Sequence, residues 1–120
     1  MITRIAGALL AVADQDAMKE FFCGPLGFTV RTDAEMWPGA RWVEVVPPGA
    51  ETGLVINRAS DFEREPDAQY PMTFATDDVN GLVTTLRAAG VPVSDPVTEA
   101  WGTFVRVTDP EERDLLVAQR

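Results

Sequence analysis

The sequence predicts an α+β fold of two βαβββ modules, in which each curved mixed sheet has a helix on one face and a concave cleft on the other. Three observations support this prediction: an internal repeat, two capped amphipathic helices and paired alternating strands. The chain has 120 residues, 46% of them apolar and 24% charged, as in one globular domain. We expect module one at residues 1–58, a linker at 59–69 and module two at 70–120.

The internal repeat aligns two apolar segments that each run into an acidic residue. An offset of 64 residues places Asp14 over Asp78, and an offset of 62 places Leu54 over Leu116. A duplicated pattern of this length indicates that each copy is one supersecondary unit. Both copies therefore have the predicted order strand, helix, strand, strand, strand.

One helix is predicted in each module, and capping residues mark its ends. The first helix follows Asp14 and stops at Gly24-Pro25, whereas the second follows Asp77 or Asp78 and ends before Gly90. Apolar residues form one stripe on each helix: Met18, Phe21 and Phe22 on the first, and Val79, Leu82, Val83 and Leu86 on the second. Each stripe is expected to cover a sheet.

Alternating valines predict half-buried antiparallel strands in both modules. They are Val43 and Val45 in the first copy, and Val105 and Val107 in the second. If these valines face the helices, the intervening side chains point into the concave cleft. The ligand-binding residues that we predict are Trp37, Trp42, Glu44, Trp101, Phe104, Arg106, Leu9 and Leu54.

Composition excludes several kinds of function. The chain has no histidine, so it has neither imidazole catalysis nor histidine-ligated metal. Its net charge of −9 disfavours nucleic acid and anionic membranes as partners. The single cysteine, Cys23, cannot form an internal disulfide, which indicates a reducing, cytoplasmic location. Residues 5–13 are apolar, but their recurrence in the repeat predicts a strand rather than a secretion signal.

A series of short motifs is distributed along the whole chain. The motifs are Val12-Ala13-Asp14, Phe21-Phe22, Gly24-Pro25-Leu26-Gly27-Phe28, Thr76-Asp77-Asp78-Val79, Trp101-Gly102 and Asp109-Pro110-Glu111. Together they resemble the vicinal oxygen chelate superfamily, which includes glyoxalase I, extradiol dioxygenases, fosfomycin-resistance enzymes and bleomycin-resistance proteins. The resemblance implies paired βαβββ modules and a homodimer with two clefts.

Enzymes of this superfamily hold a divalent metal at four positions on the first and last strands of the modules. By the resemblance, these positions fall on Gly7, Pro71, Leu54 and Leu116, and none of these side chains ligates a metal. We therefore expect no metal, no cofactor and no catalytic residue. Glu44 is the one carboxylate considered as a general base, against the alternative that it is a solvent-facing side chain.

The resulting hypothesis is a metal-independent, homodimeric antibiotic-binding protein. It would confer resistance by sequestering an aromatic or cationic natural product, such as a bleomycin-like or enediyne compound, as the metal-free bleomycin-resistance proteins do. Two alternatives stay open. One is a glyoxalase-like lyase or a dioxygenase-like enzyme with an atypical or absent metal site. The other is a non-catalytic interaction domain.

Overall fold

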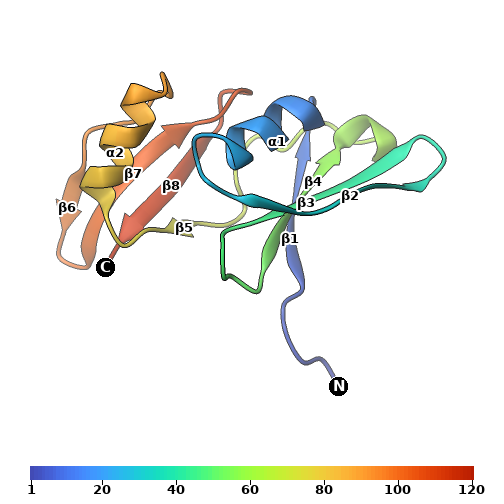
Figure 1. Cartoon of the computed structure of the whole chain (residues 1–120), viewed down its shortest axis with the longest axis horizontal. Helices are drawn as coiled ribbons and strands as arrows, with labels where there is room; N and C mark the ends of the chain where they lie inside the picture. The colour runs from blue at the N-terminus through green and yellow to red at the C-terminus, as the bar shows by residue number, and fades with distance from the viewer. The chain divides into compact units, whose positions relative to one another are not determined.

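The computed structural model describes residues 1–120 as two compact units, Met1–Asp67 and Ala68–Arg120. Each unit contains one four-stranded mixed sheet with one α-helix beside it (Figure 1). The predicted α+β fold of repeated βαβββ modules is confirmed. No helix has the length and apolar character that crossing a membrane requires.

Unit one contains five regular elements of the module and a short helix after them. They are β1 (Gly7–Val12), α1 (Gln15–Cys23), β2 (Thr29–Trp37), β3 (Ala40–Val46), β4 (Gly53–Arg58) and the 3-10 helix η1 (Ala59–Phe62). The sheet order is β1-β4-β3-β2, with β1 parallel to β4 and the other pairs antiparallel. Helix η1 lies in the segment for which the sequence predicts no regular structure.

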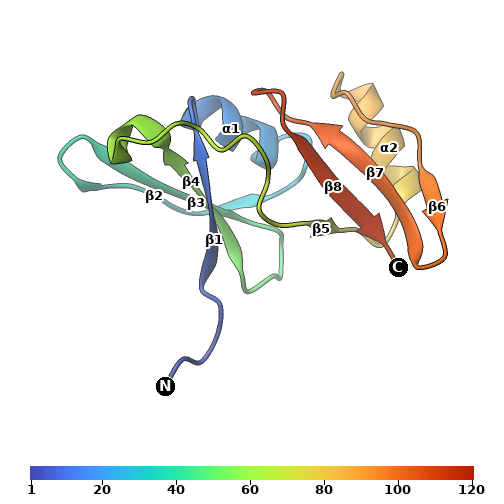
Figure 2. The same ribbon diagram turned by 180° about the vertical axis from the view of Figure 1, so that it is seen from behind.

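Unit two repeats the same topology with shorter outer strands. Its elements are β5 (Phe74–Ala75), α2 (Val79–Ala88), β6 (Val97–Glu99), β7 (Gly102–Thr108) and β8 (Asp114–Gln119). The sheet order is β5-β8-β7-β6, and β5 is parallel to β8. In Figure 2, β7 and β8 lie in front of α2, so this view looks onto the sheet face that the helix leaves uncovered.

Both helices begin at the predicted acidic caps. The Asp14 carboxylate accepts a hydrogen bond from the backbone N–H of Ala17 at 3.0 Å, and Asp78, not Asp77, accepts one from Gly81 at 2.9 Å. These bonds satisfy N–H groups that have no partner within the helix. Gly90 follows α2 with a φ of +77°, a left-handed conformation that glycine adopts without strain.

The alternating strand residues divide between two faces as predicted. Val43, Val45, Val105 and Val107 are fully buried on the sheet faces that the helices cover. Phe22 and Leu86 from the helix stripes are also fully buried. We call the opposite face of each sheet its open face. Strand alternation places the side chains between the valines on the open faces.

The two modules differ in the turn before the last strand. Residues 47–52 connect β3 to β4, whereas the shorter segment 109–113 connects β7 to β8. The sequence offset of 62 therefore falls to 61 in the last strand. Register shows this directly, because Val45 lies opposite Leu54 while Val107 lies opposite Leu115. The alignment of Leu54 with Leu116 is wrong by one residue.

Candidate ligand-binding site

A hollow of about 410 Å³ lies on the open face of unit one. Most of its surface is apolar, with a few polar groups at one side, as is common in small-molecule sites. Its lining residues are Arg4, Ala6, Gly7, Leu9, Arg31, Trp42, Glu44 and Val55.

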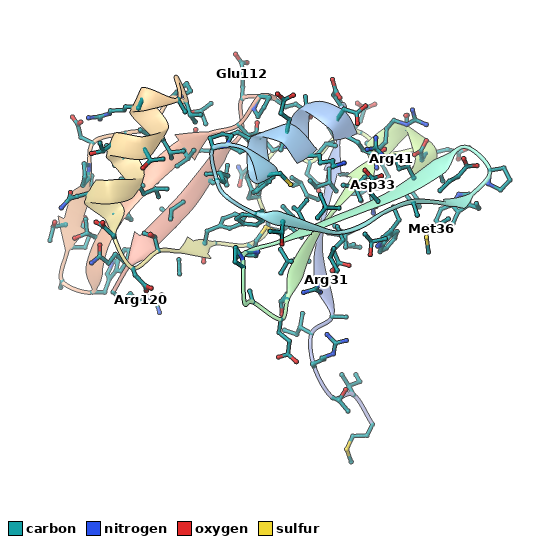
Figure 3. All side chains as sticks on the ribbon, in the orientation of Figure 1. Arg31, Asp33, Met36, Arg41, Glu112 and Arg120 are labelled. Atoms are coloured by element: carbon teal, nitrogen blue, oxygen red, sulfur yellow. The ribbon has the colours of Figure 1, made fainter.

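Strand register brings these side chains together from separate parts of the chain. Val55 on β4 lies between Leu9 on β1 and Glu44 on β3, and register partners share a face. A β-bulge between Val30 and Thr32 interrupts the pairing of β2, and the Arg31 side chain extends onto the open face there. Figure 3 shows Arg31 on the side of the sheet away from α1.

Two glycines lie beneath the carboxylate of Glu44 on this face, and one of them makes room for it. A Cβ at Gly53 would lie 2.5 Å from Oε2 of Glu44, and a Cβ at Gly7 would lie 3.6 Å from the same atom. The Glu44 side chain is 13% exposed, and its Oε2 is 3.2 Å from Nη1 of Arg31. The absence of a side chain at Gly53 therefore leaves space for the carboxylate in the hollow, whereas a Cβ at Gly7 would meet it only at ordinary contact distance.

Arg31 also binds the turn that precedes β4. Its Nη2 donates to the backbone carbonyl of Glu51 at 2.7 Å and to that of Ala50 at 3.4 Å. The guanidinium thus holds Glu44 and the turn together. The carboxylate of Glu44 thus accepts a charge-assisted hydrogen bond inside the hollow.

On unit two, aromatic and cationic side chains form a row on the open face. The rings of Trp101 and Phe104 are stacked with centroids 5.7 Å apart and planes 14° apart. The guanidinium of Arg106 lies 5.3 Å from the centre of the Phe104 ring, and that of Arg120 lies 6.0 Å from the Trp101 ring. Both separations suit cation–π attraction.

A second hollow, of about 380 Å³, lies on unit two beside β5. It is lined by Thr73, Phe74, Ala75, Thr76, Asp77, Ala118 and Arg120. Ala118 is the register partner of both Phe104 and Ala75, which connects this hollow to the row of rings across the open face.

Six of the eight predicted ligand-binding residues lie on the open faces. Leu9, Trp42 and Glu44 line the hollow of unit one, and Trp101, Phe104 and Arg106 form the row on unit two. Because the two units are separate bodies, these are two groups of residues, each on its own sheet.

Leu54 and Trp37 lie elsewhere. Leu54 is 4% exposed and lies on the helix-covered face as the partner of Val45. Val55 occupies the position on the open face instead. Trp37 is the last residue of β2, and its ring contacts that of Phe62 edge to face with the ring centres 5.9 Å apart. Strand β2 is longer than its sequence pattern indicates.

The lining residues that the sequence analysis missed include Arg4, Arg31, Val55 and Arg120. Register would have found Val55, because it lies beside Glu44 once the turn length is known. Arg31 depends on the bulge in β2, for which the sequence gives no signal. Arg4 and Arg120 lie outside the strands, where alternation makes no prediction.

The corners used for metal binding in related enzymes do not fit a metal here. With the register corrected, the relevant positions on the open faces are Gly7, Val55, Pro71 and Leu116. None offers an oxygen, nitrogen or sulfur side-chain ligand. No group of three or more carboxylate or cysteine side chains is positioned to hold a metal ion.

The turn before β8 is held by a buried ionic network. Oδ1 of Asp109 accepts from the N–H groups of Glu111 at 2.7 Å and Arg113 at 3.0 Å. Its Oδ2 accepts from the Tyr70 hydroxyl at 2.8 Å and from Arg113 at 3.1 Å. Burial, and then the bond to Asp109, raise the pKa of Tyr70 above its usual value. Glu112 adopts a left-handed φ of +66°.

Cys23 offers no nucleophile to either hollow. It ends α1 as a half-buried free thiol, and it lines neither of the hollows on the open faces. Burial raises the pKa of this thiol despite the nearby charge of Lys19, so the unreactive protonated form predominates at neutral pH.

The two βαβββ modules define a domain of the vicinal oxygen chelate type. The family model described as "Glyoxalase/Bleomycin resistance protein/Dioxygenase superfamily" matches residues 4–114. The chain belongs to this superfamily. It is also 32% identical over 120 residues to the uncharacterized protein YetH of Bacillus subtilis, covering 99% of this chain and 100% of YetH.

Solved structures agree with this assignment. A superfamily member from Sphaerobacter thermophilus is 28% identical with a TM-score of 0.91, covering 99% of this chain and 98% of that one. TnmS3 from Streptomyces sp. CB03234, described as an antibiotic binding protein, is 27% identical with a TM-score of 0.86, covering 98% and 96% of the two chains. UcmS2 is 23% identical with a TM-score of 0.85 and shares the fold.

Proposed function

We propose that the chain binds an aromatic natural product on its open faces and confers resistance by sequestering it in the cytoplasm, without a metal. The observation that carries this proposal is the hollow of unit one, whose mostly apolar lining includes Trp42. Stacking of a ligand on an aromatic ring contributes about 0.5 to 1.5 kcal/mol beyond the burial of area.

The polar groups of the hollow favour binding over chemistry. Glu44 forms an ion pair with Arg31. Its carboxylate can still accept a hydrogen bond from a ligand, but the ion pair disfavours a role as general base. The corners of both sheets lack the ligands for the Lewis acid used by related enzymes. The similarity to TnmS3, an antibiotic binding protein, supports the same interpretation.

We further propose that the working form is a homodimer. One open face contacts only one side of a planar ligand, and a ligand is buried on most of its surface in a typical small-molecule site. A second sheet face must therefore cover the other side. Size-exclusion chromatography with light scattering tests this, and a monomer at micromolar concentration that still binds ligand would contradict it.

The proposal is tested by binding of bleomycin, mitomycin C and an enediyne to the purified protein. We expect one of them to quench tryptophan fluorescence and to raise the melting temperature, because a ligand at 100 times its Kd stabilises the folded state by about 2.7 kcal/mol. Trp42→Ala should weaken this binding about tenfold, in line with the loss of one stacked ring.

Trp37→Ala is the matched control, because Trp37 contacts Phe62 and does not line the hollow. Mass spectrometry of the ligand after incubation separates sequestration from catalysis. Recovery of unaltered ligand is expected, and a converted product would overturn the proposal in favour of an enzyme. Equal loss of binding in both tryptophan variants would remove the hollow as the site.

A further inference from the structure

The basic side chains of the protein fall into two groups. Seven of the ten form ion pairs with carboxylates: Lys19, Arg31, Arg41, Arg58, Arg64, Arg87 and Arg113. The remaining three, Arg4, Arg106 and Arg120, form no ion pair, although the chain has 19 acidic residues. In a protein with a net charge of −9, these three guanidinium groups are thus left without a carboxylate partner.

All three unpaired arginines lie beside the candidate sites. Arg4 lines the hollow of unit one together with Trp42. Arg106 and Arg120 flank the stacked rings of Phe104 and Trp101 on unit two. Arg120 also lines the second hollow. Figure 3 shows the Arg120 side chain at the end of β8.

Two carboxylates near this row do not pair with its arginines. Glu99 lies opposite Gly102 on β6, and Asp77 lines the second hollow with Arg120. Neither lies within ion-pairing distance of Arg106 or Arg120. An arginine presents a planar fork of donors that matches a carboxylate or sulfonate, and it also stacks on aromatic rings.

We infer that the open face of unit two binds an aromatic ligand that carries an anionic group, such as a carboxylate, a sulfonate or an ionised phenol, and that Arg106 and Arg120 bind that group. This inference rests on the proposed function and selects between ligand charges. The residue pattern alone is compatible with a cationic ligand. The arginines disfavour a cationic ligand, because two guanidinium groups beside the rings repel a cation and attract an anion.

The test uses three pyrene probes with the same ring system and different charge: 1-pyrenecarboxylate, 1-pyrenemethanol and 1-pyrenemethylammonium. Tryptophan quenching gives the Kd of each probe for the full chain at low and high salt. We expect the carboxylate to bind about tenfold more tightly than the alcohol at low salt, because its hydrogen bonds are charge-assisted. High salt should reduce this preference by screening.

The double variant Arg106→Gln/Arg120→Gln should remove the preference and leave binding of the alcohol unchanged. Arg87→Gln is the matched control, since Arg87 pairs with Asp95 on the same unit and lines neither hollow. Both variants change solvent-exposed side chains, so both are expected to fold.

The outcomes distinguish a failure of the charge inference from a failure of the proposed function. If the alcohol and the carboxylate bind equally, or if the ammonium probe binds best, the charge inference is wrong while the proposed function stands. If none of the three aromatic probes binds, the proposed function fails with it. A preference for the carboxylate that survives in the double variant would show that other residues read the charge, and it would overturn the assignment to Arg106 and Arg120.

Discussion

The two units share one backbone plan and carry opposite charges at one equivalent position of their open faces. At equivalent positions of β3 and β7, Trp42 corresponds to Phe104 and Glu44 corresponds to Arg106. Glu44 is partly buried above two glycines and paired with Arg31, whereas Arg106 is exposed and lies against a ring. Duplication therefore preserved which side chains face the cleft, and divergence changed what they bind.

The turns before the last strands differ in the same way. In unit one, Arg31 from a neighbouring strand holds the turn through backbone carbonyls and is partly exposed. In unit two, the network around Asp109 joins residues of the turn to the Tyr70 hydroxyl, and the Asp109 side chain is fully buried. Equivalent turns are thus stabilised by a surface contact in one unit and by a buried charge in the other, so mutations in the two turns should change stability by different amounts.

The largest expected effect is on the buried turn of unit two. Asp109→Ala should destabilise the protein by about 3 to 5 kcal/mol, because it leaves the buried Arg113 guanidinium without its carboxylate partner. Urea unfolding followed by circular dichroism measures the change.

Two matched variants sharpen this prediction. Tyr70→Phe removes one hydroxyl bond to Asp109 and should cost about 1 kcal/mol. Asp95→Ala breaks an exposed pair with Arg87 and should cost less than about 0.5 kcal/mol. An Asp109→Ala effect no larger than that of Asp95→Ala would show that the turn does not depend on its buried charge.

A smaller effect is expected at the glycine floor of unit one. Gly53→Ala would place a Cβ 2.5 Å from Oε2 of Glu44 and should displace that side chain from Arg31. We expect a loss of about 1 to 2 kcal/mol in the free energy of unfolding, similar to losing a charged hydrogen bond. Binding of the aromatic ligand should weaken as well.

Gly7→Ala is the control for this pair of glycines. Its Cβ would meet no atom closer than 3.4 Å, so the substitution fits the space. Because alanine is favoured over glycine in a strand by about 0.5 kcal/mol, Gly7→Ala should be neutral or slightly stabilising. Equal destabilisation by both substitutions would mean that Glu44 is not positioned by Gly53.

The smallest effect is the pH dependence of a surface cluster found only in unit one. Asp33 accepts hydrogen bonds from Arg41 and Lys19, each at 2.6 Å, and these bonds hold the pKa of its carboxyl well below the usual 3.8. Figure 3 shows Asp33 and Arg41 on the α1 side of the sheet. A carboxyl with a lowered folded-state pKa stabilises the fold above its unfolded pKa, and this contribution is lost as the pH falls.

Asp33→Asn should therefore be less stable than the wild type at pH 7 by about 1 kcal/mol, the upper end for an exposed pair. This difference in the free energy of unfolding should shrink below pH 3.8, because the carboxyl of the unfolded wild type then binds a proton that the folded protein does not. Thermal unfolding across this pH range measures it. Glu20→Gln, next to Lys19 on α1 and outside any ion pair, should show no such change, and a constant difference at every pH would contradict the assignment.

The repeated pattern predicted the fold because it depends on local physical chemistry. Asp14 and Asp78 cap helices by bonds to residues three positions later, and Val43 and Val105 face the core by strand alternation. The same alternation placed Trp42, Glu44, Phe104 and Arg106 on the open faces. Leu54 was misplaced because one turn is a residue shorter than its copy, and a shift of one residue moves a side chain to the other face of a strand.

The amino-acid sequence by itself determined the two modules, their capped helices and the absence of metal ligands at the expected corners, since each follows from residue type and short-range spacing. Only the tertiary structure decided that Glu44 lies above Gly7 and Gly53, that a bulge turns Arg31 toward it and that Asp109 is buried with Arg113. These features depend on register between strands far apart in the chain, and no local pattern specifies that register.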